Sequence, residues 1–414
     1  MKIQSLRGMP DLFPEDLERW HMFESKLSEI FHSFNTHEIR TPLLESTELF
    51  SRSVGNSSDI VNKELYSFLD RNDESISLRP EGSASVIRAI IQKKQEHEKH
   101  KLWYQGPMFR YERPQKGRFR QFHQVGVEYL GYEEGIAEYE LISMVLQINK
   151  LIGISDYTIK INHLGDQDAK ESFCNSLTAF LKPHINELHE KDQARLKSNP
   201  LRVLDSKEKS TQELLKEGPK FQDFISNDSK IFLKNLVDAF SNHCDIQIDQ
   251  SLVRGLDYYT GIVFETVSEK LGAQDAFLGG GRYDNLSKQL GGKDMYAIGF
   301  AIGVERIIEL LNIENIKQPL KVGFIIVGEQ IDKKTYKIAD DLRSANNSII
   351  LDTFLSEGSL KSQLRRANKN NCGYAIIIGA EEIKNDQIIW KSLSESGEQE
   401  LLSLNEVIQK YTNL

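Results

Sequence analysis

The segment GPMFRYERPQKGRFRQFHQVGVEYL, residues 106–130, carries the most informative pattern in the sequence. An apolar lead-in, a middle broken by a proline and a glycine, and an alternating end predict a strand, a loop and a second strand. On an extended strand Phe122, Gln124, Gly126 and Glu128 share one face, because successive side chains point to opposite sides. An amide, a gap without a side chain and a carboxylate are therefore expected to line one surface.

The loop between the two strands is basic in a chain whose formal net charge is −9. Its cationic residues are Arg110, Arg113, Lys116, Arg118 and Arg120. Arginine binds phosphate and carboxylate groups through its planar fork, so the loop indicates an anionic ligand. The alternative is a basic hairpin that is merely solvated. That alternative does not explain why Gln124 and Glu128 flank a glycine on the strand that follows the loop.

The residues Phe109–Pro114 and Arg120–Gln124 resemble motif 2 of the class II aminoacyl-tRNA synthetases, in the form that histidyl-tRNA synthetases have. The resemblance implies an ATP-dependent enzyme that attaches an amino acid to tRNA. The rest of the chain can be compared with that expectation.

Length and composition are those of an ordinary soluble protein, with 414 residues and 27% charged side chains. This length predicts two or three domains, and the negative balance restricts any RNA contact to local patches. The scattered Cys174, Cys244 and Cys372 lack metal-site spacing and indicate reduced thiols. The sequence shows neither a signal peptide nor a membrane span, so we expect a cytoplasmic protein without structural zinc.

Residues 14–34 form an apolar stripe at helical spacing and predict a helix, followed by a strand over Glu38–Glu45. A helix packed on its own core explains the stripe equally well. In class II synthetases this unit resembles motif 1, the dimer interface, which implies a homodimer.

Residues 65–69 and 75–78 predict a hairpin, followed by the turn Arg79-Pro-Glu-Gly-Ser83 and a helix. A strand-to-helix turn with Ser83 near the helix cap is the simple interpretation. It accounts less well for Glu81, which the resemblance assigns to the α-amino group of histidine.

The region from Gly165 to about Ile248 is charged and predicted to be mostly helical. It occupies the place of the insertion domain that in histidyl enzymes is thought to clamp the acceptor arm of tRNA. His163-Leu-Gly-Asp166 is only superficially similar to the class I nucleotide motif, and no Walker A segment is present.

The segment Val253–Glu265 contains Arg254-Gly-Leu-Asp-Tyr-Tyr259, which resembles a signature specific to histidyl enzymes. By itself, a lone Arg254–Asp257 pair is more often structural than catalytic. This segment identifies the amino acid more firmly than motif 2 does.

Leu278–Asp284, with three consecutive glycines, is predicted to join a strand to a helix close to a ligand, or to form only a tight turn. Ala297–Arg306 predicts a strand and then a helix, and it resembles motif 3. Arg306 lies in the first turn of that helix, where the macrodipole disfavours a cation unless an anion is near. A surface arginine paired with an acid is the alternative.

Lys317–Pro319 marks a domain boundary, beyond which apolar strands alternate with helices. The predicted order is strand 321–327, helix 331–346, strand 348–353, helix 359–370, strands 373–378 and 387–391, and a final helix. One side of helix 359–370 is basic, with Lys361, Arg365, Arg366 and Lys369. In the family this domain binds the anticodon, and such a helix suits RNA phosphates; a solvated face is the alternative.

The fold we expect is α+β: an antiparallel sheet flanked by helices, with a helical insertion and a C-terminal α/β anticodon-binding domain. The predicted parts are residues 1–166 and 249–318 for the catalytic core, 167–248 for the insertion and 320–414 for the anticodon-binding domain. The implied activity is that of a histidine–tRNA ligase, which makes histidyl-adenylate from histidine and ATP and transfers the histidyl group to tRNA(His).

The resemblance also implies site residues, with Arg254 and Arg110 as the catalytic pair. The histidine site comprises Glu81, Gly82, Ser83, Arg110, Gln124, Glu128, Arg254, Tyr258 and Tyr259. The ATP site comprises Arg110, Arg118 and Arg306, with Mg²⁺ bridging the phosphates, and Arg254 replaces a further metal ion, so that no protein metal site is expected. Arg113 and Gln115 are assigned to the tRNA acceptor end.

The main rival interpretation is a non-catalytic relative, the histidine-sensing regulatory subunit of ATP phosphoribosyltransferase. That relative typically lacks the anticodon domain and has degraded motif arginines. Here residues 320–414 are present, and so are the motif arginines Arg110, Arg254 and Arg306. A generic RNA-binding protein explains the basic helix but not the combination of Glu81, Gln124 and Glu128.

Overall fold

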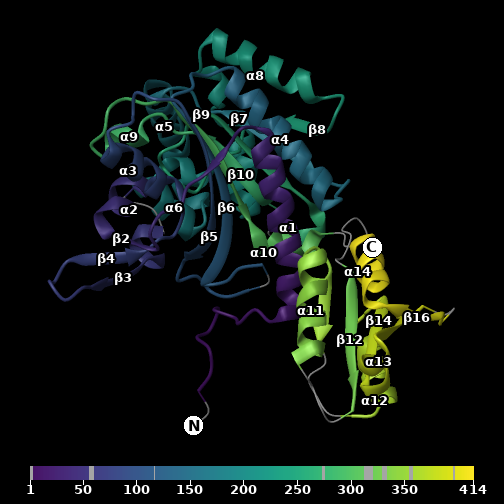
Figure 1. Cartoon of the computed structure of the whole chain (residues 1–414). Helices are drawn as coiled ribbons and strands as arrows, with labels where there is room; N and C mark the ends of the chain where they lie inside the picture. The colour runs from purple at the N-terminus through teal and green to yellow at the C-terminus, as the bar shows by residue number, and fades with distance from the viewer. Residues whose placement is uncertain are drawn as a thin grey trace. The chain divides into compact units, whose positions relative to one another are not determined.

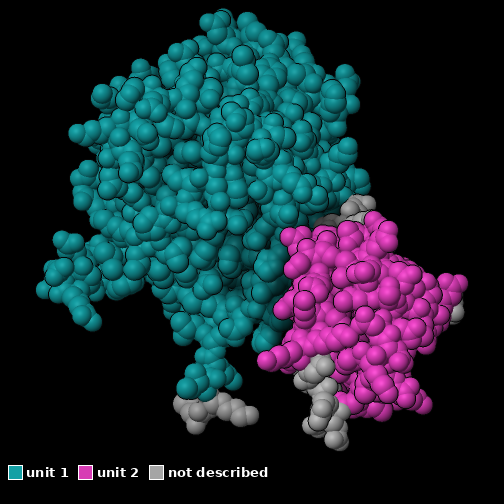
Figure 2. Space-filling model, in the orientation of Figure 1, with its two compact units in different colours: residues 1–315 teal, residues 316–414 magenta. Residues whose placement is uncertain are grey.

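The computed structural model describes residues 3–55, 60–115, 117–272, 276–311, 320–328, 333–353, 358–394 and 397–414. It divides into two compact units, residues 1–315 and 316–414 (Figure 2). The boundary predicted at Lys317–Pro319 lies outside the described residues. No helix in the described part of the chain is both long and apolar enough to span a membrane.

An eight-stranded sheet forms the centre of the first unit (Figure 1). In spatial order its strands are β1 (His37–Glu38), β5 (His100–Phe109), β6 (Gln121–Leu130), β11 (Ala297–Gly303), β10 (Ala276–Arg282), β9 (Thr260–Val267), β7 (Thr158–His163) and β8 (Asp245–Ile248). The pairings are antiparallel except for β1 with β5 and β7 with β8. The predicted antiparallel sheet flanked by helices is confirmed.

The motif 1 region begins with α1 (Pro14–Ser33), which buries Trp20, Phe23 and Phe31 and packs on α4 (Ile136–Ile152). The single strand expected over 38–45 is wrong. The chain instead forms β1 and then β2 (Leu44–Ser46), which belong to different sheets. Pro42 lies between them and has no N–H to offer a ladder, while the Arg79 guanidinium donates to the carbonyl of Thr41.

The expected hairpin is confirmed as β3 (Tyr66–Leu69) and β4 (Ser75–Leu78), which form a small sheet with β2. In Figure 1 this hairpin projects from the body of the first unit. Between β2 and β3 lie α2 (Thr47–Val54) and a π-helical segment, Ile60–Glu64. After β4 the chain turns into α3 (Ser83–Lys93).

The region expected to be helical starts after β7 and contains α5 (Gln167–Leu181), α6 (Glu190–Ser198), α7 (Lys209–Lys216) and α8 (Asn227–Phe240). Short 3₁₀ turns lie between them, among them Pro200–Val203. The region ends in β8, which pairs in parallel with β7. The helical prediction missed this strand, whose four residues join the edge of the central sheet.

The triple glycine lies inside β10, where Gly279, Gly280 and Gly281 pair with both β9 and β11. The alternative of a tight turn at these glycines is therefore wrong. The expected connection from a strand to a helix is present, and it lies between the end of β10 and the short helix α9 (Leu286–Gln289). The strand and helix predicted for motif 3 are confirmed as β11 and α10 (Val304–Leu310).

The second unit contains a five-stranded sheet in the order β13-β12-β14-β15-β16. Its elements are β12 (Lys321–Val327), α11 (Lys333–Ala345), β13 (Ile350–Thr353), α12 (Leu360–Lys369), β14 (Tyr374–Gly379), α13 (Ala380–Asn385), β15 (Gln387–Ser392), β16 (Gln399–Ser403) and α14 (Leu404–Thr412). Strands β13, β12 and β14 are parallel, whereas β15 and β16 pair antiparallel. The sequence pattern had missed α13 and β16.

Candidate active site

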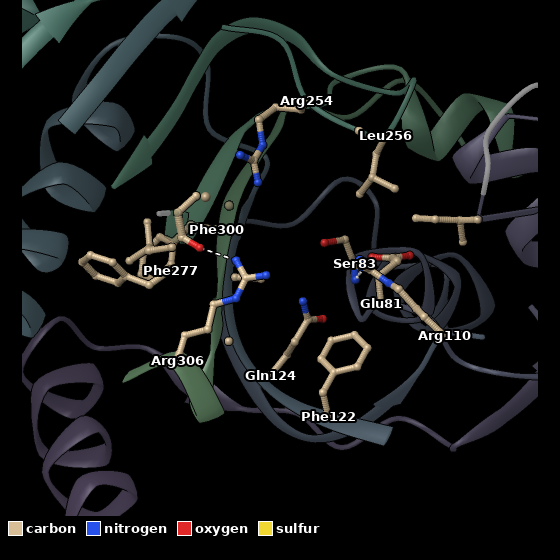
Figure 3. A pocket seen from close by; sticks show the side chains of 18 of the residues that line it. Glu81, Ser83, Arg110, Phe122, Gln124, Arg254, Leu256, Phe277, Phe300 and Arg306 are labelled. Carbon is tan, nitrogen blue, oxygen red and sulfur yellow. Dashed lines mark hydrogen bonds between the residues drawn. The ribbon is translucent and has the colours of Figure 1, made fainter. Parts of the chain in front are cut away.

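A cavity of about 250 Å³ lies on the central sheet of the first unit. Of the residues assigned to ligands from the sequence, those that line it are Glu81, Ser83, Arg110, Arg118, Gln124, Arg254, Tyr258, Tyr259 and Arg306. Figure 3 shows Arg254, Arg306, Gln124 and Arg110 entering the cavity from different sides. The fold thus brings together residues from widely separated stretches of sequence.

Only part of the polar face predicted for residues 122–128 lines the cavity, and the rest of it is buried next to the cavity. Phe122 and Gln124 line the cavity, and the side-chain oxygen of Gln124 is buried without a hydrogen-bond partner among the described residues. Gly126 pairs with Tyr104 of β5, and a Cβ added to it would overlap the Tyr104 ring. The glycine gap is therefore filled by a neighbouring tyrosine.

Glu81 caps the helix α3. Its Oε2 accepts from the backbone N–H of Ser83 at 2.6 Å, and its Oε1 accepts from that of Ala84 at 3.0 Å. Burial raises the pKa of Glu81, while these N–H donors oppose the rise. Ser83 was expected near the cap and is indeed the first helical residue, but Glu81 does the capping. Gly82 is the N-cap residue, and it packs against the ring of Tyr104.

Glu128 is buried next to the cavity and not among its lining residues. The hydroxyl of Ser83 donates to its Oε1 at 2.6 Å, and the hydroxyl of Tyr283 donates to its Oε2. Burial raises the pKa of Glu128 to about 8; the two hydroxyl donors oppose the rise, and the nearby Glu81 carboxylate adds to it. Since Ser83 and Tyr283 both line the cavity, they connect this carboxyl group to it.

Four buried tyrosines form one wall of the cavity: Tyr104, Tyr258, Tyr259 and Tyr283. The ring of Tyr258 lies 4.8 Å from that of Tyr259 and 5.5 Å from that of Tyr283, centroid to centroid. Burial raises the pKa of all four, so their hydroxyls stay protonated and able to donate. Sequence reasoning missed Tyr104 and Tyr283; the glycines that make room for Tyr104 were the available signal.

Arg254 reaches the cavity across β10. Its Nη1 lies 3.0 Å from Oε2 of Glu265, and a Cβ at Gly279 would overlap its guanidinium. Its Nε is buried without a hydrogen-bond partner among the described residues. The acid paired with Arg254 is thus Glu265 of β9 and not Asp257 as the sequence suggests, while Asp257 accepts from the amide of Asn199 at 2.7 Å.

The other three arginines that line the same cavity are each held by hydrogen bonds or an ion pair. Arg110 donates from Nε to the carbonyl of Pro80 at 2.9 Å. Arg118 forms an ion pair with Glu112 at 2.8 Å. Arg306 donates to the carbonyls of Gly117 and Ala276, which ties the motif 2 loop to β10.

Arg113 and Gln115 lie outside the cavity, on the exposed part of the motif 2 loop. Backbone hydrogen bonds between Gln115 and Arg118 close a tight turn at this point. The base of the loop is tied to the N-terminal segment, because the N–H of Arg120 donates to the carbonyl of Gly8 at 2.7 Å. Lys116 lies outside the described residues.

Comparison with known proteins connects this geometry to one family. Residues 8–307 match the family model for histidyl-tRNA synthetase, and residues 321–414 match that for an anticodon binding domain. The histidine–tRNA ligase of Francisella philomiragia subsp. philomiragia is 42% identical over 416 residues, which cover 98% of each chain.

Solved structures agree with the sequence comparison. The apo histidyl-tRNA synthetase of S. aureus superimposes with a TM-score of 0.80 at 31% identity, over 99% of this chain and 100% of that one. A Bacillus halodurans protein described as an ATP phosphoribosyltransferase regulatory subunit/histidyl-tRNA synthetase has a TM-score of 0.64 at 21% identity, over 92% of this chain and 99% of that one. At this identity the second match shows the fold alone.

Proposed function

The chain belongs to the histidyl-tRNA synthetase family and is a histidine–tRNA ligase, and we propose that the cavity described above is where it activates histidine. The reaction has two steps: histidine and ATP give histidyl-adenylate and pyrophosphate, and the terminal ribose hydroxyl of tRNA(His) then takes the histidyl group. One observation carries the assignment of the cavity. Four arginines line the same pocket as carboxyl, amide and phenol groups.

Activation requires alignment and charge neutralisation more than proton transfer. The attacking carboxylate of histidine is already ionised at neutral pH, so no protein base is needed to generate the nucleophile. Negative charge must be brought together at the α-phosphorus, and preorganised cations lower that cost. We assign Arg254 and Arg110 to the α-phosphate and the substrate carboxylate, and Arg306 and Arg118 to the outer phosphates.

The carboxyl, amide and phenol groups at the cavity suit histidine itself. The unpartnered oxygen of Gln124 and the carboxylate of Glu81 are acceptors for its ammonium group. Tyr259 is assigned to one imidazole nitrogen. Glu128, which does not itself line the cavity, is assigned to the other through the Ser83 and Tyr283 hydroxyls that are bonded to it. An imidazole has one donor and one acceptor nitrogen when neutral, which matches a carboxyl group and a phenol.

Mg²⁺ is proposed to enter with ATP. No group of three or more His, Cys, Asp or Glu side chains is placed to hold a metal ion within the described ranges. Mg²⁺ commonly binds through substrate phosphates and only one or two protein carboxylates. Glu112 lines the cavity and is the acid we assign to this ion, which would neutralise phosphate charge there.

The tRNA contacts are proposed at two places. The exposed Arg113 and Gln115 on the motif 2 loop are assigned to the acceptor end. The basic side of α12, where Lys361, Arg365 and Lys369 are exposed, is assigned to anticodon-arm phosphates. The match of residues 321–414 to an anticodon binding domain supports the second assignment.

We further propose a homodimer that works in the cytoplasm. Leu43 and Leu44 near β2 are 42% and 44% exposed, and Phe68 and Leu69 on the hairpin are 48% and 63% exposed. Such grouped apolar side chains are expected at a subunit interface. The cysteines are free thiols, which is consistent with a reducing compartment.

The test is ATP–pyrophosphate exchange with each of the twenty amino acids. Histidine alone should support exchange, whereas a histidine-sensing regulatory subunit would bind histidine without exchange. Robust exchange with another amino acid would contradict the assignment of the pocket.

A further inference from the structure

The segment from Arg254 to Tyr259 separates two cavities. Arg254, Leu256 and Tyr259 line the proposed active site. On its other side Asp257 lines a second, more open cavity of about 440 Å³, whose other walls come from α5 and the residues around Asn199. The segment that carries the proposed catalytic arginine therefore lies next to the helical insertion on the side away from the proposed active site.

Lys170 of α5 makes the principal contact from the insertion. Its Nζ donates to the backbone carbonyl of Asp257 at 2.7 Å and to that of Tyr259 at 3.1 Å. Burial lowers the pKa of Lys170, and the nearby Asp257 carboxylate opposes the fall. Removing an ammonium group from water is costly unless it is well paired. The two carbonyl oxygens therefore stabilise the buried ammonium group, and the ammonium group in turn fixes the position of the two carbonyls.

The N-cap residue of the 3₁₀ turn Pro200–Val203 and one residue within that turn make further contacts. The side-chain amide of Asn199 donates to Oδ1 of Asp257 at 2.7 Å. The guanidinium of Arg202 donates to the carbonyl of Gly255 at 3.0 Å. Donors from the insertion thus reach three residues of the segment: Gly255, Asp257 and Tyr259.

We propose that Lys170, Asn199 and Arg202 are positioning residues for histidine activation, because they fix the backbone on which the Arg254 guanidinium and the Tyr259 ring are carried. The inference rests on the proposed roles of Arg254 and Tyr259. Reacting groups must be aligned closely, and a misplacement of about 1 Å can cost roughly 100-fold in rate. The insertion therefore contributes to the first chemical step.

The deciding variant is Lys170→Met, which keeps the apolar stem and removes the donors. Adenylate formation should be measured at single turnover and normalised to titrated active sites, so that misfolded protein does not count. We expect the rate per active site to fall roughly 10–100-fold, with a higher KM for histidine and a KM for ATP that changes little. Lys170→Arg, which retains donors, should recover part of the rate.

Lys191→Met is the matched control, because this exposed lysine lies on α6 of the same insertion. It should behave like the parent protein. If folded Lys170→Met has the parent rate and the parent KM for histidine at each active site, the inference is wrong. A lower melting temperature alone, with those two values unchanged, would show a purely structural contact.

A second variant decides the matter if Lys170→Met does not fold. Asn199→Asp keeps the oxygen that accepts from the N–H of Leu201 at 3.2 Å, but it replaces the donor to Asp257 by a carboxylate. The same loss of rate is expected, and parent-like kinetics would overturn the inference. Failure of the proposed function is separate, since the parent protein would then show no exchange with histidine.

Discussion

Arg254 is paired with Glu265 of the neighbouring strand β9, with Nη1 and Oε2 3.0 Å apart, and both side chains are partly exposed at 23% and 19%. A guanidinium group has five N–H donors, so the contact with Glu265 leaves other donors for a ligand. The pair therefore fixes the direction of the Arg254 side chain and leaves some of its N–H donors available for a ligand. Asp257, which lies three residues after Arg254 in the sequence, instead contacts the insertion.

Replacement of Arg254 by alanine should reduce the rate of adenylate formation by roughly 10²–10³-fold, the scale for removal of one preorganised electrostatic donor. Histidine affinity should fall less, because the transition state carries more charge at the α-phosphorus than the ground state. Lysine should rescue poorly, since a point charge cannot bridge two oxygens. Single-turnover kinetics beside a thermal melt provide the measurement, and a folded variant with the normal rate would show that Arg254 has only a structural role.

Gly279→Ala should imitate the loss of Arg254 while leaving the arginine in place. A methyl group there overlaps the guanidinium, so the side chain must move away from its present position. We expect adenylation to fall at least about tenfold, because a displaced catalytic group loses its alignment. A folded Gly279→Ala variant with the rate of the parent protein would contradict the proposed placement of Arg254.

Glu128→Gln should change the pH dependence of stability. The folded-state pKa of Glu128 is about 8, whereas an unfolded glutamate titrates near pH 4.3. Between these values the folded protein keeps a proton that the unfolded chain has lost, so this group makes stability fall as pH rises, by at most about 1.4 kcal/mol per pH unit. Glutamine removes this slope.

The comparison for Glu128→Gln is the free energy of unfolding from denaturant titrations at pH 5 and pH 8. The variant should gain relative to the parent protein as pH rises, while histidine activation falls because the carboxyl group is gone. A constant difference between the two proteins across this range would place the pKa of Glu128 near its ordinary value.

Gln115→Ala should slow the transfer of the histidyl group to tRNA and leave adenylate formation close to normal. The reason is position, since Gln115 is exposed on the loop and does not line the cavity. Exchange assays report the first step, and single-turnover transfer from preformed adenylate reports the second. Equal damage to both steps would assign the residue to the ATP site.

Charge reversal on α12 should weaken tRNA binding without affecting the chemistry of activation. Changing Lys361 and Arg365 to glutamate should raise the KM for tRNA and flatten its salt dependence, because each lost phosphate contact lowers the slope by about one. Lys384→Glu, an exposed lysine on α13 of the same unit, is the control. Pyrophosphate exchange should be unchanged, and an unaltered KM for tRNA would exclude α12 from the RNA surface.

Much of the fold could be predicted because its strands and helices have clear periodicity. Helix α1, the hairpin β3–β4 and the strand–helix pair β11–α10 all follow the spacing of their apolar residues, and turn or helix-start residues lie at their ends. The errors have physical causes. The residue types around Pro42 favour a single strand, although the proline separates two sheets. The glycines of β10 resemble a turn in sequence, yet they serve close packing inside a sheet.

The site was less predictable than the fold. Gln124 and Arg110 could be found because an amide on a strand face and a basic loop are conspicuous, whereas the role of Arg254 follows only from the resemblance to the histidyl signature. Tyr104 and Tyr283 were missed because a tyrosine in an apolar strand is indistinguishable from an ordinary core residue. The support of the Arg254–Tyr259 segment by Lys170 joins residues far apart in the chain, and no spacing rule reports such a contact.

The parallel pairing of β7 with β8 also has a consequence for how this architecture can vary. The chain leaves the sheet at β7 and re-enters it on the adjacent strand β8, so the two ends of the intervening helices are anchored side by side. The entropy cost of closing such an excursion grows only slowly with its length, by about 0.6 kcal/mol for each doubling. The sheet therefore tolerates an excursion of different length, whereas the support of the Arg254–Tyr259 segment requires a donor at the position of Lys170.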